Sequence, residues 1–110
     1  MGKKLTIRAR VYDTGDVTHP RTIILTGRYA QTLRELVKAG DKGVTALEIS
    51  SWALRLSHYV FILRTDPRYE INIETQLEEH EVDGMGAAKH GRYFLRTPVE
   101  LISDYLQAAE

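Results

Sequence analysis

The stretch SSWALRLSHYVFILR, residues 50–64, combines the apolar content of a buried helix with the polar residues of a surface helix. Arg55 and His58 lie in its middle, where a fully buried helix would have to leave two polar groups without water. In an α-helix, where successive residues are about 100° apart, most of the apolar side chains fall on one stripe and the others lie outside it. The segment therefore predicts a helix whose core stripe consists of Leu56, Tyr59, Val60 and Leu63.

A second stripe of the same predicted helix carries its polar residues. The spacing i, i+4, i+7 and i+11 places four residues on one face: Ser51, Arg55, His58 and Ile62. Leu54 and Phe61 belong to neither stripe, so we expect them to pack against another part of the chain or against another subunit.

Two further helices are predicted ahead of this one, so that residues 28–66 form three helices in succession. The first spans about 28–39, where apolar residues recur with helical spacing and Gly40 follows as a C-terminal cap. Thr45 and Glu48 form a T-x-x-E capping box, which predicts a short second helix over about 45–50.

The segments before and after the three predicted helices have the period of strands. LTIRARV, residues 5–11, alternates apolar and polar side chains, and with RTIILT it predicts a β-hairpin over residues 1–27. EINIETQL alternates again and predicts a second hairpin over 70–97, whose long tip is the glycine-rich DGMGAAKHG. A second T-x-x-E box at Thr97, with proline in the next position, predicts a C-terminal helix over 98–108.

Three helices followed by a hairpin is the order of a winged helix-turn-helix domain. The motifs VTALEIS, RLSHYVFILR and YEINIET also resemble the small winged helix-turn-helix proteins of phages and prophages, over roughly residues 43–75. We therefore expect a single α+β domain over residues 1–110. It would be a winged helix-turn-helix with a three-helix core and a two-stranded wing, preceded by the N-terminal hairpin and followed by the C-terminal helix.

This fold implies a double-stranded DNA partner, with the third helix in the major groove. Arg55 is then placed to contact guanine, while Ser51 and His58 reach bases or phosphates. Phosphate contacts are expected from Arg64, Lys42 and the basic group at the wing tip and its exit, which consists of Lys89, His90 and Arg92. A surface ion pair explains Arg55 as well, an ordinary surface histidine explains His58, and a thymine methyl is the contact open to Ile62.

The charge distribution favours a second interpretation. Residues 1–68 hold 12 Lys and Arg against 6 Asp and Glu, a balance of +6, whereas residues 69–110 hold 3 against 9, a balance of −6. The acidic wing and the net charge of zero are unusual for a dedicated DNA-binding protein. The alternative is a winged helix adaptor that binds a protein and does not bind DNA.

Other classes of function lack a sequence signal. The chain has no cysteine, no phosphate-binding glycine motif and no nucleophile or zinc-protease motif, so we expect no enzyme, cofactor, metal or small-molecule ligand. No apolar run is long enough for a membrane span and the N-terminus lacks a signal-peptide core, so we expect a cytoplasmic protein. A homodimer is expected, because one small module rarely supplies enough affinity for DNA, and the C-terminal helix or Leu54 and Phe61 would form its seam.

Overall fold

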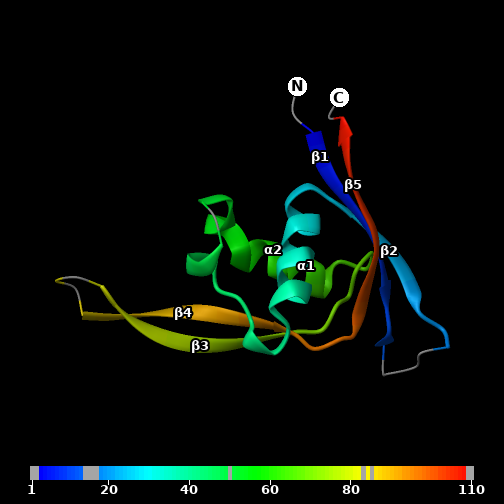
Figure 1. Cartoon of the computed structure of the whole chain (residues 1–110). Coiled ribbons are helices and arrows are strands. Elements are labelled where there is room, and N and C mark those ends of the chain that lie inside the picture. The colour runs from blue at the N-terminus through cyan, green and yellow to red at the C-terminus, as the bar shows by residue number, and fades with distance from the viewer. Residues whose placement is uncertain (1–2, 14–17, 50, 83, 85, 109–110) are drawn as a thin grey trace.

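The computed structural model describes residues 3–13, 18–49, 51–82, 84 and 86–108. Figure 1 shows a sheet on one side, helices in the middle, and a long hairpin that reaches away from them. In chain order, the elements are β1 (Lys3–Val11), β2 (Arg21–Thr26), α1 (Gly27–Ala39), the 3₁₀ turns η2 (Gly40–Lys42), η3 (Ala46–Glu48) and η4 (Ser51–Arg55), α2 (Leu56–Thr65), β3 (Ile73–Val82), β4 (Gly86–Leu95) and β5 (Val99–Ala108).

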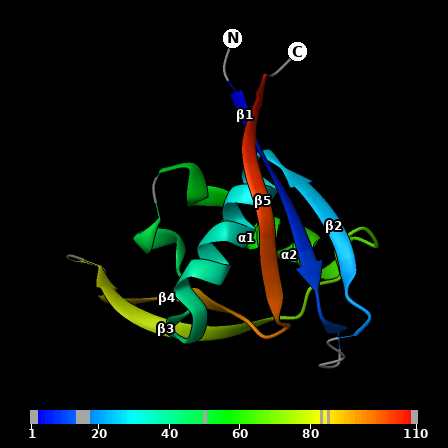
Figure 2. The ribbon, with the colours of Figure 1, turned by 45° about the vertical axis from the view of Figure 1, so that its right-hand side comes forward.

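Strand β1 lies at the centre of an antiparallel sheet with the order β2-β1-β5. Figure 2 shows the three strands side by side, with the helices against one face of the sheet. The predicted alternation is confirmed, because every second side chain of β1 is buried against the helices: Leu5, Ile7, Ala9 and Val11. The predicted pairing of β1 with β2 is confirmed as well.

The C-terminal segment is a strand, so the predicted helix over 98–108 is wrong. The hydroxyl of Thr97 accepts a hydrogen bond from the backbone N–H of Asn72, with N···Oγ1 at 3.0 Å. It therefore makes a tertiary contact and does not cap a helix. Beyond Pro98, β5 pairs antiparallel with β1 from Val99 onward and satisfies the second edge of that strand. Tertiary pairing therefore outweighs a local helix-start signal.

Helix α1 agrees closely with its predicted span. It begins at Gly27 and ends at Ala39, and it buries Ala30, Thr32, Leu33 and Leu36. Gly40 follows with φ of 56°, and its N–H donates to the carbonyl of Leu36. The positive φ explains why glycine occupies the end of this helix.

The segment between α1 and α2 is more tightly wound than predicted. The backbone N–H of Thr45 donates to Glu48 Oε1 at 3.0 Å, which confirms the capping box. The box opens only the single turn η3, because Ile49 returns to extended backbone, so the predicted helix over 45–50 is wrong in length. Ser51–Arg55 is also a 3₁₀ turn, and the α-helix begins only at Leu56.

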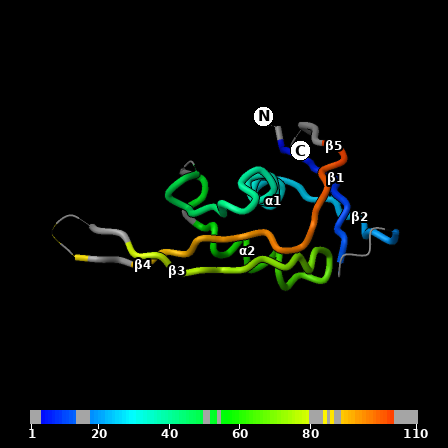
Figure 3. Tube along the Cα trace, turned by 60° about the horizontal axis from the view of Figure 1, so that its bottom comes forward, coloured from blue at the N-terminus to red at the C-terminus, as the bar shows by residue number. Residues whose placement is uncertain are grey.

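Strands β3 and β4 form the predicted hairpin, called the wing below (Figure 3). They pair in continuous register from Ile73 with Leu95 to Val82 with Gly86. Most of the segment DGMGAAKHG is therefore strand, and the prediction of a long tip is wrong. Val44 adds an antiparallel bridge to Tyr93, which ties the base of the wing to the segment after α1.

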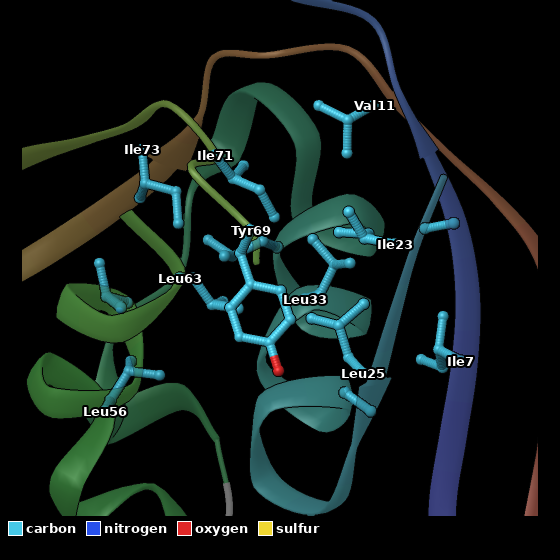
Figure 4. Close-up of a cluster of buried hydrophobic side chains, with 14 of the residues drawn as sticks. Ile7, Val11, Ile23, Leu25, Leu33, Leu56, Leu63, Tyr69, Ile71 and Ile73 are labelled. Atoms are coloured by element: carbon cyan, nitrogen blue, oxygen red, sulfur yellow. The ribbon is translucent and has the colours of Figure 1, made fainter. Parts of the chain in front are cut away.

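One hydrophobic cluster joins the three-stranded sheet, both helices and the base of the wing. Figure 4 shows Tyr69 among side chains from α1, α2 and β2, with Leu33, Leu63 and Leu25 around its ring. In α2 the predicted core stripe is confirmed for Leu56, Val60 and Leu63, which are buried, and Tyr59 is half-buried beside them. No helix in the described part of the chain is long and apolar enough to cross a membrane.

Candidate nucleic-acid interface

Five exposed residues form the outer face of α2: Ser57, His58, Phe61, Arg64 and Thr65. At about 100° per residue they span an arc of about 120°, and Phe61 lies near its middle. The prediction placed Ile62 on this face. The structure instead leaves Ile62 half-buried against the core cluster, whereas Phe61 is 54% exposed.

The beginning of α2 separates Ser51 from the other predicted contact residues. Because Ser51–Arg55 is a 3₁₀ turn, the α-helical spacing that joined Ser51 to His58 does not apply there. The side chain of Ser51 lies outside the described residues. Arg55 immediately precedes the first turn of α2, it is exposed, and it forms no ion pair with another described residue.

Arg64 links the end of α2 to the base of the wing. Its Nη1 donates to the backbone carbonyl of Ile73, at 3.1 Å, while the residue as a whole stays exposed. This contact sets the position of the first residue of β3 relative to the outer face of α2. Arg64 therefore has a structural contact in addition to the phosphate contact predicted for it.

Arg92 of β4 is the centre of a charged cluster that fixes the wing to the body of the protein. Its guanidinium donates to Glu48 Oε1 at 3.0 Å and, through Nε, to Glu78 on the neighbouring strand β3. It also donates to the backbone carbonyl of Lys42 at 3.2 Å. We call Arg92, Glu48 and Glu78 the Arg92 cluster.

The electrostatics of the Arg92 cluster follow from these hydrogen bonds. The Arg92 guanidinium holds the pKa of the Glu78 carboxyl below its ordinary value. It lowers the pKa of the Glu48 carboxyl too, with help from the backbone N–H of Thr45. The side chain of Arg92 is only 21% exposed. The structure thus places Arg92 within the wing base, where its donors are occupied, and not at the wing tip.

The rest of the predicted basic group also lies within the strand and not at the tip. His90 is opposite Glu78, with His90 Nε2 and Glu78 Oε1 at 3.2 Å. Lys89 is opposite Glu79, and both of these residues are exposed. Lys42 is exposed as well, in the turn η2 at the end of α1. Among the predicted wing cations, Lys89 is the one whose side chain faces solvent.

Intramolecular pairing offsets part of the acidity of the wing. Glu78 is engaged by Arg92, and Glu74 accepts from Arg96 Nε at 2.8 Å. The sequence showed an acidic wing, but the partners of these acids lie across the hairpin and no local pattern indicates them. Glu79, which is exposed, is the described wing acid nearest to Lys89 in the strand register.

Aromatic residues brace the start of α2 against α1. The Arg28 guanidinium carbon lies 5.2 Å from the centroid of the Trp52 ring. The Trp52 and Tyr59 rings are 6.3 Å apart, and Tyr59 meets Tyr29 edge-on at 5.7 Å. These contacts hold the turn η4 and the first turns of α2, so they fix the direction in which the outer face points.

The described residues include no group of three or more His, Asp or Glu side chains that could hold a metal ion. His80, which the sequence places near the wing tip, has its side chain outside the described residues.

The helix α1, the short turns after it, the helix α2 and the paired strands β3 and β4 follow one another in the order of the winged helix class of proteins. The family model described as "Winged helix domain" matches residues 22–105, and the chain belongs to this family. Comparisons with curated proteins and with solved structures gave no significant match. The family membership supports the predicted winged helix fold and indicates a DNA-binding regulator in general terms.

Proposed function

We propose that the protein binds double-stranded DNA with α2 in the major groove and with the wing beside it. The main observation behind this proposal is the outer face of α2, which is exposed along its length, together with the exposed Arg55 that immediately precedes the helix. The major groove of B-DNA is wide enough for an α-helix, and the exposed side chains of the helix then contact base edges.

Arg55 and Lys89 are the cations best placed to contribute. Both are exposed, and neither forms an ion pair with another residue that the structure describes. Arg55 extends the outer face of α2 toward a base or a phosphate, and Lys89 extends the wing toward a phosphate. Arg92 contributes indirectly, because it holds the wing in place through Glu48.

The test is the affinity for a labelled duplex, measured by fluorescence anisotropy from 50 to 200 mM salt. DNA binding through phosphates gives a linear fall of log K with log salt. Arg55→Ala should weaken binding by at least about fivefold, the lower end of what one base contact supplies. Arg10→Ala is the matched control, because Arg10 pairs with Glu100 on the sheet at 3.2 Å. An affinity that changes neither with the salt concentration nor in Arg55→Ala would contradict the proposal.

We infer further that the protein regulates transcription or replication in a phage or another mobile element. The resemblance of residues 43–75 to small phage and prophage proteins supports this role. Mapping the sites that the protein occupies on its own genome tests it. Sites at promoters or at a replication origin agree with regulation, whereas occupancy without any positional preference argues against it.

A homodimer would supply two copies of α2 to the DNA. One of the two predicted seams, the C-terminal helix, is the strand β5, and within the described residues β5 pairs with β1 alone. Two β5 strands related by a two-fold axis could extend the sheet across the dimer. Sedimentation equilibrium tests this: a monomer at concentrations that saturate DNA would exclude the dimer.

The alternative function is a protein-interaction adaptor without DNA binding. The observation in its favour is that Phe61 on α2 is 54% exposed and Leu77 on the wing is 71% exposed. Exposed apolar groups of this kind suit a protein partner. The same anisotropy experiment separates the two functions, because an adaptor has no salt-dependent affinity for duplex DNA.

A further inference from the structure

We propose that Phe61 recognises the methyl group of thymine in the major groove and is the residue that sets the base preference of α2. This inference rests on the proposed DNA-binding function and deepens it. It concerns which duplexes the protein prefers, whereas the proposed function concerns whether it binds duplex DNA at all.

Phe61 lies at the centre of the outer face of α2. Ser57 and Arg64 lie on one side of it around the helix axis, and His58 and Thr65 lie on the other. Whatever surface the outer face of α2 docks against therefore meets the phenyl ring of Phe61 at the centre of the contact.

The side chains that pack α2 against the core lie on the face opposite to Phe61. Leu56, Val60 and Leu63 anchor the helix to the core, so the fold does not use the ring of Phe61. Phe61 is 54% exposed and apolar, whereas the other residues of the outer face are polar. A partner that covers this face has to provide an apolar group for the ring.

Hydrogen bonds within the protein make the centre of the face still less polar. The hydroxyl of Thr65 donates to the backbone carbonyl of Phe61, with Oγ1···O at 2.7 Å. Its single donor hydrogen is therefore not available for a base acceptor. Arg64 directs one guanidinium nitrogen toward the carbonyl of Ile73. Ser57, His58 and the other N–H donors of Arg64 remain available at the two sides of the ring, so the apolar contact is confined to Phe61.

The chemistry of DNA identifies the partner of the ring. In the major groove the bases present hydrogen-bond donors and acceptors, and the C5-methyl of thymine is the apolar group among them. Covering donors and acceptors with a phenyl ring leaves them without partners, which is unfavourable. Duplexes with a thymine opposite Phe61 should therefore bind more tightly than duplexes without one.

Replacing thymine with deoxyuridine tests the inference, because it removes the methyl group and keeps the base pair. A duplex is selected from a random library for binding to the wild-type protein and is then resynthesised with dU in place of dT. Burial of one methyl group gives about a fourfold change in affinity, so the dU duplex should bind about fourfold more weakly for each methyl contacted.

Two variants show whether the methyl effect passes through Phe61. Phe61→Ala should bind the dT and dU duplexes with equal affinity. Ile24→Ala is the matched control, because Ile24 is 56% exposed but lies on the sheet strand β2, and it should keep the wild-type difference. Circular dichroism checks that each variant is folded, and Phe61→Gln repeats the test with a polar side chain of intermediate size.

The outcomes separate the inference from the function on which it rests. Equal wild-type affinities for the dT and dU duplexes would overturn the role of Phe61 and leave DNA binding intact. A methyl effect that persists in both Phe61 variants would overturn it as well, since another residue or the shape of the DNA would then be responsible. If no duplex is enriched and binding shows no salt dependence, the proposed function and this inference fail together.

Discussion

Arg92 and Glu48 are 44 positions apart in the sequence, yet the guanidinium of Arg92 donates to both carboxylate oxygens of Glu48, at 3.0 and 3.3 Å. Glu48 is also the residue that closes the capping box of Thr45. One carboxylate therefore stabilises the turn before α2 and holds β4 beside it. Together with the contact of Arg64 with Ile73, this contact fixes the wing relative to α2, as the proposed DNA binding by both elements requires.

Removing the charge of Arg92 should loosen the base of the wing. In Arg92→Met the aliphatic stem remains, but Glu48 and Glu78 lose their shared donor. We expect the amides of Val44 and Tyr93, which bond to each other's carbonyls at 2.9 Å, to exchange their hydrogens severalfold faster. Hydrogen-exchange NMR measures this. Arg68→Met is the control, because Arg68 forms its ion pair with the nearby Asp66 and contacts the Tyr69 ring, away from the wing. Unchanged exchange in Arg92→Met would contradict the role of the cluster.

Acid should destabilise the protein through the same carboxylates. Hydrogen bonds from Arg92 lower the pKa of Glu48 and of Glu78 from an ordinary value of 4.5, and the pKa of Asp66 falls to about 2 beside Arg68. Below these ordinary values the unfolded chain binds more protons than the folded chain. Stability is therefore fully present above about pH 4.5 and is lost as the pH falls through the lower, folded-state values.

Urea unfolding at pH 7, 4 and 3 measures this dependence. The midpoint should fall between pH 7 and pH 3, and it should fall less in Arg92→Met, whose Glu48 and Glu78 lose the hydrogen bond that lowers their pKa values most. A midpoint that rises in acid, or an equal fall in both proteins, would show that these carboxylates do not govern the acid response.

The sequence predicted those parts of the fold whose signals are local and agree with their tertiary surroundings. The alternation of β1 and the helical stripe of α1 are examples, since each apolar face meets the core that its period implies. Thr97 shows the opposite case. Its T-x-x-E box is a valid helix start, but its hydroxyl bonds to Asn72, 25 positions away, and the chain after it completes the sheet.

The candidate site was predictable to a similar extent. The core stripe of α2 was correct because it lies within regular α-helix. Ile62 was misplaced because its side chain packs against the core cluster, and the spacing that joined Ser51 and Arg55 to this helix does not hold across the 3₁₀ turn before Leu56. The role of Arg92 was missed because its partners come from η3 and β3. No spacing in the sequence brings Glu48 and Glu78 to the same guanidinium.

Gly43 should not tolerate a side chain. Its φ of 66° and ψ of 176° belong to a region that is essentially limited to glycine, and a Cβ there would lie 2.7 Å from the Phe94 ring. We expect Gly43→Ala to lower the free energy of unfolding by at least about 2 kcal/mol, from backbone strain and overpacking together. Gly40→Ala is the control, because its φ is also positive but no atom lies within 4 Å. Equal losses in chemical denaturation would show that the contact with Phe94 has no effect.

Phe61 and Leu63 should differ sharply in their effect on stability. Leu63 is fully buried, so Leu63→Ala should cost about 2–5 kcal/mol. Phe61→Ala removes an exposed ring and should stay within about 0.5 kcal/mol of the wild type. Urea unfolding of both variants checks this pair. A large loss in Phe61→Ala would mean that the ring supports the fold, and the side chain would then not be available to a partner.

Lys89 should control the salt dependence of DNA binding without changing sequence preference. It is exposed on β4, opposite Glu79, and a phosphate is the partner that an exposed lysine on a wing finds on duplex DNA. Loss of one phosphate contact in Lys89→Ala should reduce the slope of log K against log salt by about 0.9, with similar weakening for every duplex. Lys4→Ala, on the sheet strand β1, should leave the slope unchanged. If Lys89→Ala also leaves it unchanged while Arg55→Ala weakens binding, then α2 contacts the DNA without the wing.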